Sequence, residues 1–458
     1  MSGDLEKRPT KSEAPSEVPV SQSLQRVRLR RIIRDLAVSV ALTLALIVVK
    51  EFLVEHSLIG RHLRAMGNDW LQSYLGGEED SEIAILDISP IDFAPGRDYT
   101  PREKMQHIID ALLERKPVPA IGFDVNFSPK AGERFIAPGE DASFFYYCLS
   151  HGQKLNNRLV LGINDSVARG RNQPLGAAQF DCLSAYIGHL KPDTAGPRPE
   201  MIVSIKVPYL SDTGGLGFWT LPSLPLALAS SVQRPPCFDE SLLRNVRKVE
   251  LGEECQSCSF QAMVVDFGHA EKFQFESIPV PDDDSSIALL SEDDHLLNKR
   301  FVLVGRVQNP DEADLFAIPG HTGKQYPGVV LMACELYTLL HTLYVPSRVE
   351  GALIEGVISI GIFGFVAVMR LYYNKRRIEV VATHRLGTIL TGLAVLGLVV
   401  FGVFMLPKFR FYWEAIPVVI VVFLLHHFME PNLDTWWHAI VRRVRATWEF
   451  AVFGGRKV

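Results

Sequence analysis

Five polar residues of this 458-residue chain have the types and spacing of a binding site. Asp87 and Ser89 end one apolar segment, Asp124 ends a second, Arg102 lies between the two, and Asp314 follows far along the chain. The carboxylates could bind an amine or a divalent cation, and Arg102 could fix an anionic group. Alternatively, the aspartates cap helices and pin loops, with Arg102 as their structural counter-ion.

The segments that carry these residues are typical of a βαβ unit. Residues 83–89 and 120–125 are short apolar runs of strand length, and residues 101–115 place apolar side chains at helical spacing. Such a unit implies a parallel sheet, in which ligands approach the carboxyl ends of the strands. We therefore expect Asp87 and Asp124 at one edge of an α/β domain, mostly parallel sheet with flanking helices.

The same patterns predict further elements between residues 63 and 340. Strands are expected at 158–163, 201–207, 263–268 and 301–305. Helices are expected at 63–75, around 144–149, from 221 to 229 and at 328–340. The first of these helices would bury an apolar face made of Leu63, Met66, Trp70, Leu71 and Tyr74.

Long apolar runs on either side of this block predict four transmembrane helices, because each approaches the ~20 residues that cross a bilayer. The predicted organisation is a disordered cytoplasmic tail at 1–30, spans at 35–54, 351–370, 386–406 and 412–429, an outer domain at 55–350 and an amphipathic tail at 430–458. The tail is predicted either to anchor on the membrane or to dock a cytoplasmic partner.

The distribution of charge predicts the orientation. Arginine and lysine cluster before the first predicted span, between the second and third, and in the C-terminal tail. The positive-inside rule then places both termini in the cytoplasm and the large domain in the periplasm of a bacterial inner membrane. The outer block holds more acidic than basic residues, which argues against nucleic acid or anionic lipid as its ligand.

All six cysteines lie in the predicted outer block, as expected for an oxidising compartment. Cys255 and Cys258 lie in a polar loop with neither a second Cys-x-x-Cys nor a histidine pair nearby, so we predict a disulfide rather than a metal or redox site. The pairing partners stay open. Cys334 lies in an apolar helical run and is expected to be a buried free thiol.

An ordered set of short motifs gives the chain a family resemblance. In chain order they are Ile-Leu-Asp-Ile-Ser at 85–89, Thr-Pro-Arg at 100–102, Ile-Gly-Phe-Asp at 121–124, Ser-Leu-Pro-Leu-Ala at 223–227, Val-Asp-Phe-Gly at 265–268, Phe-Val-Leu-Val-Gly at 301–305, Asp-Leu-Phe at 314–316 and Pro-Gly-Val at 327–329. Residues 83–342 thereby resemble the second type of CHASE domain, an extracellular sensory module associated with cyclases and histidine kinases. The chain departs from the family pattern at Thr100 and at 332–334, where Met-Ala-Cys replaces His-Ala-Asn.

The predicted function is that of a membrane-bound sensor. Residues 430–458 are too few for the output domain that commonly follows in the resembled family, so a separate cytoplasmic partner is expected, and the chain could form a homodimer. The sequence contains no hydrolase, zincin, P-loop or kinase motif, and we expect neither enzymatic activity nor a cofactor. A structural or assembly protein that binds a protein partner is the alternative, and a small transporter or channel a third class. A sensor predicts a crevice at the strand ends, whereas an assembly protein predicts an exposed apolar patch.

Overall fold

The computed structural model describes residues 58–75, 81–93, 99–126, 138–155, 158–164, 187–188, 200–210, 216–231, 246–249, 259–308, 314–321, 323–341 and 343–347, with a few further positions between 349 and 443. The described residues from 58 to 351 belong to one compact unit.

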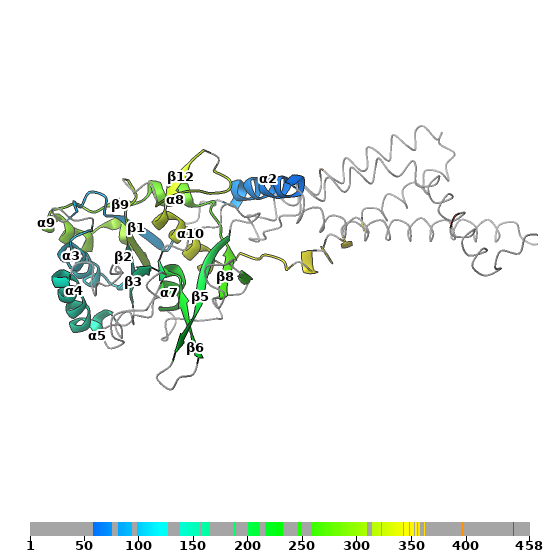
Figure 1. Ribbon diagram of the computed structural model, residues 1–458. Helices are drawn as coiled ribbons and strands as arrows, with labels where there is room; N and C mark the ends of the chain where they lie inside the picture. The colour runs from blue at the N-terminus through cyan, green and yellow to red at the C-terminus, as the bar shows by residue number, and fades with distance from the viewer. Residues whose placement is uncertain are drawn as a thin grey trace, which may run out of the picture. The chain divides into compact units, whose positions relative to one another are not determined.

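A six-stranded parallel sheet forms the centre of this unit, with the strand order β4-β3-β2-β10-β1-β9 (Figure 1). Its strands are β1 (Ile83–Asp87), β2 (Ala120–Asn126), β3 (Leu159–Asn164), β4 (Ile187–Gly188), β9 (Ile278–Pro279) and β10 (Phe301–Gly305). The predicted parallel sheet is therefore confirmed. Strand β10, although it comes late in the chain, lies between β1 and β2.

Helices cover both faces of the sheet (Figure 1). They are α3 (Arg102–Leu113), α4 (Pro138–Ser150), α5 (Gly152–Leu155), α7 (Leu224–Ser231), α8 (Ala270–Phe275), α9 (Asp284–Ala288) and α10 (Gly328–Leu340), with short 3₁₀ turns at Leu289–Ser291 and Asp294–Leu296. All residues of β1 and β10 are buried, as continuous apolar strands covered on both faces require.

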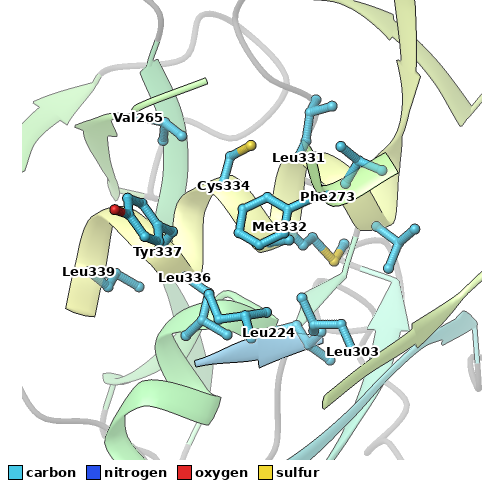
Figure 2. Packing of buried hydrophobic residues seen from close by; sticks show 14 of the residues in the cluster. Leu224, Val265, Phe273, Leu303, Leu331, Met332, Cys334, Leu336, Tyr337 and Leu339 are labelled. Carbon is cyan, nitrogen blue, oxygen red and sulfur yellow. The ribbon is translucent and has the colours of Figure 1, made fainter. Parts of the chain in front are cut away.

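Alternate residues of each central strand enter two separate cores. From β1, Ile83 and Ile85 pack with α7, α8 and α10, whereas Ala84 and Leu86 pack with α3, α4 and α9. This alternation follows from the two-residue period of a strand. Figure 2 shows the first core, in which Leu336 of α10 lies beside Leu224 of α7.

A second sheet is antiparallel and has the order β6-β5-β8-β7. Its strands are β5 (Glu200–Leu210), β6 (Leu216–Pro222), β7 (Val246–Val249) and β8 (Ser259–Val264). A separate hairpin pairs β11 (Leu315–Ala317) with β12 (Gln325–Pro327). The strand expected at 263–268 is shifted, because β8 ends at Val264 and the following residues turn towards α8.

Helix α2 (Leu58–Leu75) anchors on the α/β unit through a polar side chain. Gln72 donates from Nε2 to the carbonyl oxygen of Val265 at 2.9 Å and accepts from the backbone N–H of Phe267 at 2.8 Å. Leu71 is buried as predicted, but Met66 is 56% exposed. The predicted apolar face was wrong at Met66: the buried side of α2 includes the polar residues Asn68 and Gln72, which a pattern of apolar residues does not reveal.

Most residues of the predicted spans, 35–54, 351–370, 386–406 and 412–429, lie outside the described residues, as do both tails apart from one position. Among the helices that the structure describes, none has the length and apolar character of a membrane span. Cys148 and Cys334 are buried and neither forms a disulfide, which confirms the prediction of a buried thiol at Cys334. The predicted disulfide of Cys255 or Cys258 falls outside the described part of the chain.

Candidate functional site

Asp87 occupies the carboxyl end of β1 and links it to the loop after β10. The strand register pairs Asp87 with Gly305. Its Oδ1 accepts hydrogen bonds from the backbone N–H of Ser89 at 2.9 Å, from the Ser89 hydroxyl at 2.5 Å and from the backbone N–H of Val307 at 2.8 Å. Ser89 Oγ also accepts from the N–H groups of Val307 and Gln308 at 3.1 and 3.0 Å. Both predicted site residues therefore hold the loop that leaves β10.

The second carboxylate oxygen of Asp87 differs from the first. The side chain is fully buried, and Oδ2 makes no hydrogen bond to any residue that the structure describes. Burying an unpaired carboxylate oxygen is costly, and such atoms recur where a protein binds water, an ion or a ligand. Asp87 thus has a clear structural role through Oδ1 and retains binding capacity at Oδ2.

Asp124 lies near the carboxyl end of β2, at the same edge of the sheet as Asp87. Strand β2 pairs with β10 up to Phe123 and Val304, so Asp124 and Asp87 flank Gly305 on opposite sides. The approach is close, since a Cβ added to Gly305 would lie 3.2 Å from the Cβ of Asp124. The structure therefore brings the two predicted aspartates to one edge of the sheet, as the βαβ pattern implied.

Asp314 lies at the N-terminus of α10. A Cβ added to Gly328, the first residue of that helix, would lie 2.5 Å from Asp314 Oδ1. A carboxylate at this position is stabilised by the positive end of the helix dipole. The geometry of Asp314 thus matches the helix-capping alternative raised by the sequence.

Arg102 is 1% exposed and starts α3. Its backbone N–H donates to Glu140 Oε2 of α4 at 3.3 Å, and its guanidinium lies over the Tyr99 ring at 5.5 Å. Tyr99 in turn donates from its hydroxyl to Glu140 Oε1 at 3.2 Å. These contacts link the start of α3 to the start of α4. The two helices follow β1 and β2 at the carboxyl edge of the sheet.

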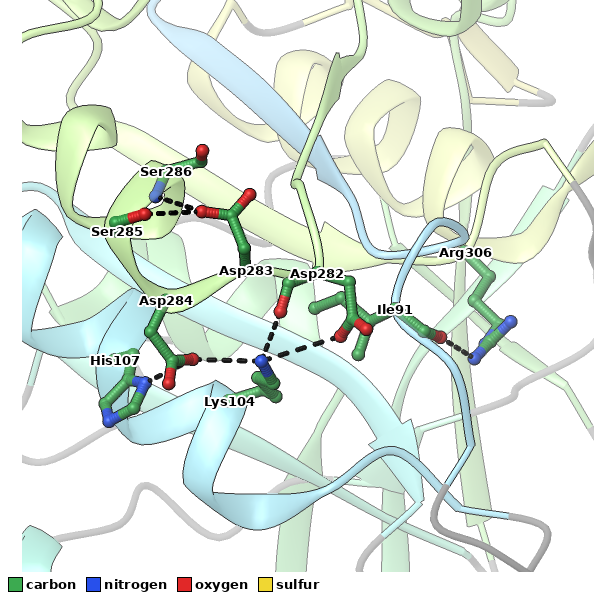
Figure 3. A network of polar contacts seen from close by, with 9 residues as sticks. All are labelled: Ile91, Lys104, His107, Asp282, Asp283, Asp284, Ser285, Ser286 and Arg306. Carbon is green, nitrogen blue, oxygen red and sulfur yellow. Dashed lines mark hydrogen bonds and ion pairs between the residues drawn. The ribbon is translucent and has the colours of Figure 1, made fainter.

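Two further sets of contacts hold the loops at this edge (Figure 3). Lys104 of α3 forms an ion pair with Asp284 of α9 at 2.9 Å. Asp283 accepts from the Ser285 hydroxyl at 2.7 Å and, as the cap of α9, from the N–H of Ser286 at 2.8 Å, and these hydrogen bonds lower the pKa of Asp283 to about 2. In the second set, Arg306 in the loop after β10 donates to the carbonyl of Ile91 in the loop after β1, at 2.9 Å.

A pocket of about 740 Å³ adjoins the loop held by Asp87 and Ser89. Its lining comes from the loop after β10, from α8 and the residues after it, and from β12 and the residue before it: Glu271, Lys272, Gln274, Phe275, Ser277, Val307, Gln308, Lys324 and Tyr326. The volume falls in the range of small-molecule sites. Val307 and Gln308 connect the pocket to the predicted site, because their N–H groups bond Asp87 and Ser89.

A hydrogen-bonded chain fixes the buried wall of the pocket. The Phe267 carbonyl can only accept, so the 3.1 Å contact to His321 places a hydrogen on Nε2. On its other side, His321 shares a hydrogen bond between Nδ1 and the Tyr326 hydroxyl at 2.9 Å, and Nδ1 also lies 3.4 Å from Glu271 Oε1. At the pocket mouth Lys324 donates to Glu271, and this bond lowers the pKa of the Glu271 carboxyl.

Sequence reasoning missed the pocket residues Lys272, Lys324 and Tyr326. They belong to a short helix and a three-residue strand, whose patterns are too brief to show periodicity. In the described residues, no group of three or more histidine, cysteine or acidic side chains could hold a metal ion. The cation alternative considered for the aspartates therefore gains no support here.

Comparisons with protein-family models, with curated protein sequences and with solved structures find no match to this chain. The resemblance to the second type of CHASE domain consequently depends on the motifs alone.

Proposed function

We propose that the chain is a membrane-bound extracytoplasmic sensor, whose α/β domain binds a ligand and passes a signal through its spans to a separate cytoplasmic partner. One observation carries the proposal: the pocket at the carboxyl edge is built partly on the residues that lead directly into α10. Lys324 and Tyr326 line the pocket, and Tyr326 lies two residues before Gly328, where α10 begins.

Helix α10 connects this pocket to the predicted second span. It packs against α8, whose residues also line the pocket, and it ends at Leu340. Residues 341–350 then lead to the predicted span at 351–370. Twelve residues of α10 are buried, so any shift of this helix would have to occur within a packed core. Packed cores favour a few discrete arrangements over continuous deformation. A ligand that contacts α8 and β12 together would therefore bias the position of α10.

Hydrogen exchange of the full chain in membranes tests the proposal. Small metabolites and divalent ions would first be screened for thermal stabilisation, and exchange would be measured with each compound that binds. The sensor predicts altered exchange both at 323–327 and at 343–350. Ligand protection confined to the pocket, with 343–350 unchanged for every compound that binds, would refute signal transfer through α10.

The alternative, an assembly protein, makes a different prediction. The described surface exposes several large apolar side chains, including Phe275 at 90%, Leu289 at 62% and Leu297 at 56%. Exposed apolar residues are common on protein surfaces and do not by themselves indicate an interface. The sensor is therefore the function that the described residues support better.

A further inference from the structure

We propose that the pocket beside the sheet edge binds a small organic anion that bears an apolar or aromatic group. This inference rests on the proposed sensor function and names the ligand class for the same pocket. Three features support it: the charged side chains of the lining, the weak ion pair that holds Lys324, and the exposed apolar side chain of Phe275.

The charged lining favours an anion. Two lysines, Lys272 and Lys324, and one carboxylate, Glu271, line the pocket. The carboxylate is held ionised by its hydrogen bond from Lys324, which lowers its pKa. The formal charges of the lining side chains sum to +1, from two lysines and one glutamate, within a chain whose formal net charge is −5. Ammonium groups form short, charge-assisted hydrogen bonds with carboxylates.

Lys324 can be recruited by a ligand at small cost. Its ion pair with Glu271 joins two exposed side chains, 60% and 55% accessible. Exposed pairs of this kind contribute little to the stability of the fold. A bound carboxylate can therefore share or replace Glu271 as the partner of Lys324 without destabilising the fold. The ammonium group has three donors, enough to contact Glu271 and a ligand together.

The remaining lining selects an organic rather than an inorganic anion. Phe275 lines the pocket although its side chain is 90% exposed, so a ligand could cover much apolar area that is now in water. Val307 and Tyr326 also line the pocket but are only 3% and 1% exposed, so Phe275 offers most of the apolar area. Gln274 and Gln308 offer neutral hydrogen-bonding groups. An anion with an apolar body would use both kinds of wall.

Benzoate is a suitable probe, with benzamide as its neutral analogue and inorganic phosphate as an anion without apolar surface. Titrations would use the purified full chain and follow binding by calorimetry. We expect benzoate to bind more tightly than either analogue. Lys324→Gln and Lys272→Gln should each weaken benzoate binding about threefold to tenfold, since an exposed charged contact contributes less than a buried one.

Lys116→Gln is the matched control, because it removes the same charge from an exposed lysine just before β2, at the opposite edge of the sheet. It should change benzoate affinity by less than about twofold, since a distant exposed charge is screened by salt. Phe275→Ala should reduce the preference for benzoate over phosphate while leaving phosphate binding unchanged.

Three outcomes would overturn the inference: no binding of benzoate, equal binding of benzoate and benzamide, or equal weakening by the Lys116 and Lys324 variants. Failure of the sensor proposal would look different. Benzoate would bind in a Lys324-dependent manner and leave exchange at 343–350 unchanged. A cationic compound that stabilises the protein and alters that segment would instead preserve the sensor and refute the anion site.

Discussion

Replacing the buried Glu335 with glutamine should abolish a pH dependence of folding stability. Glu335 lies in α10, is 1% exposed and accepts a hydrogen bond from the Ser223 hydroxyl at the start of α7. Burial raises the pKa of Glu335 to about 8 from its usual 4.5, while the bond from Ser223 acts in the opposite direction. The folded protein therefore keeps Glu335 protonated at neutral pH, whereas the unfolded chain ionises it.

The direction of the effect follows from these two pKa values. Below pH 4.5 both states are protonated, and the folded state has the full benefit of the neutral side chain. Between pH 4.5 and about 8 only the unfolded state releases the proton, so the free energy of unfolding falls as pH rises. At ~1.4 kcal/mol per pKa unit, the loss across this window is at most about 5 kcal/mol.

Glutamine reproduces the shape and hydrogen-bonding groups of a protonated glutamate but does not titrate. Urea unfolding of wild type and Glu335→Gln, followed by tryptophan fluorescence between pH 5 and 8, measures the difference directly. Subtracting one protein from the other cancels distant groups that titrate in both. We expect the variant to gain stability relative to wild type as pH rises. Glu292→Gln, at an exposed position, controls for the loss of a glutamate. If the difference in the free energy of unfolding between wild type and Glu335→Gln stays constant with pH, the reasoning is refuted.

Three other predictions address packing, orientation and redox state. Gly305→Ala would place a Cβ 2.8 Å from the Cβ of Val329 and should destabilise the fold by ~1–3 kcal/mol, whereas Gly152→Ala has no neighbour within 4 Å and should be nearly neutral in the same urea unfolding. A reporter fused after Glu350 should behave as periplasmic and one fused after Val458 as cytoplasmic, as the distribution of basic residues implies; the reverse would reject the proposed topology. Alkylation with and without reductant, read by mass spectrometry, should reveal at least one disulfide among the six cysteines; six reactive thiols without reductant, in denatured protein, would contradict it.

The amino-acid sequence determined the elements of the parallel sheet and their consequence for Asp87 and Asp124. Runs such as 83–87 and 301–305 are apolar at every position or nearly so, which is the signature of strands buried on both faces. Helix α10 occupies Gly328–Leu340, the predicted residues. Since a helix links two parallel strands, both aspartates had to reach the same edge. Local periodicity and chain connectivity were sufficient for these conclusions.

Only the tertiary structure decided which distant segments complete that edge. The place of β10 between β1 and β2, and the bond from Val307 to Asp87 across 220 residues, depend on pairing partners that local patterns do not specify. The pocket likewise joins 271–277, 307–308 and 324–326, segments too short to show their own period. Burial patterns report that a side chain is covered, whereas the identity of the covering segment depends on the packing of the whole domain.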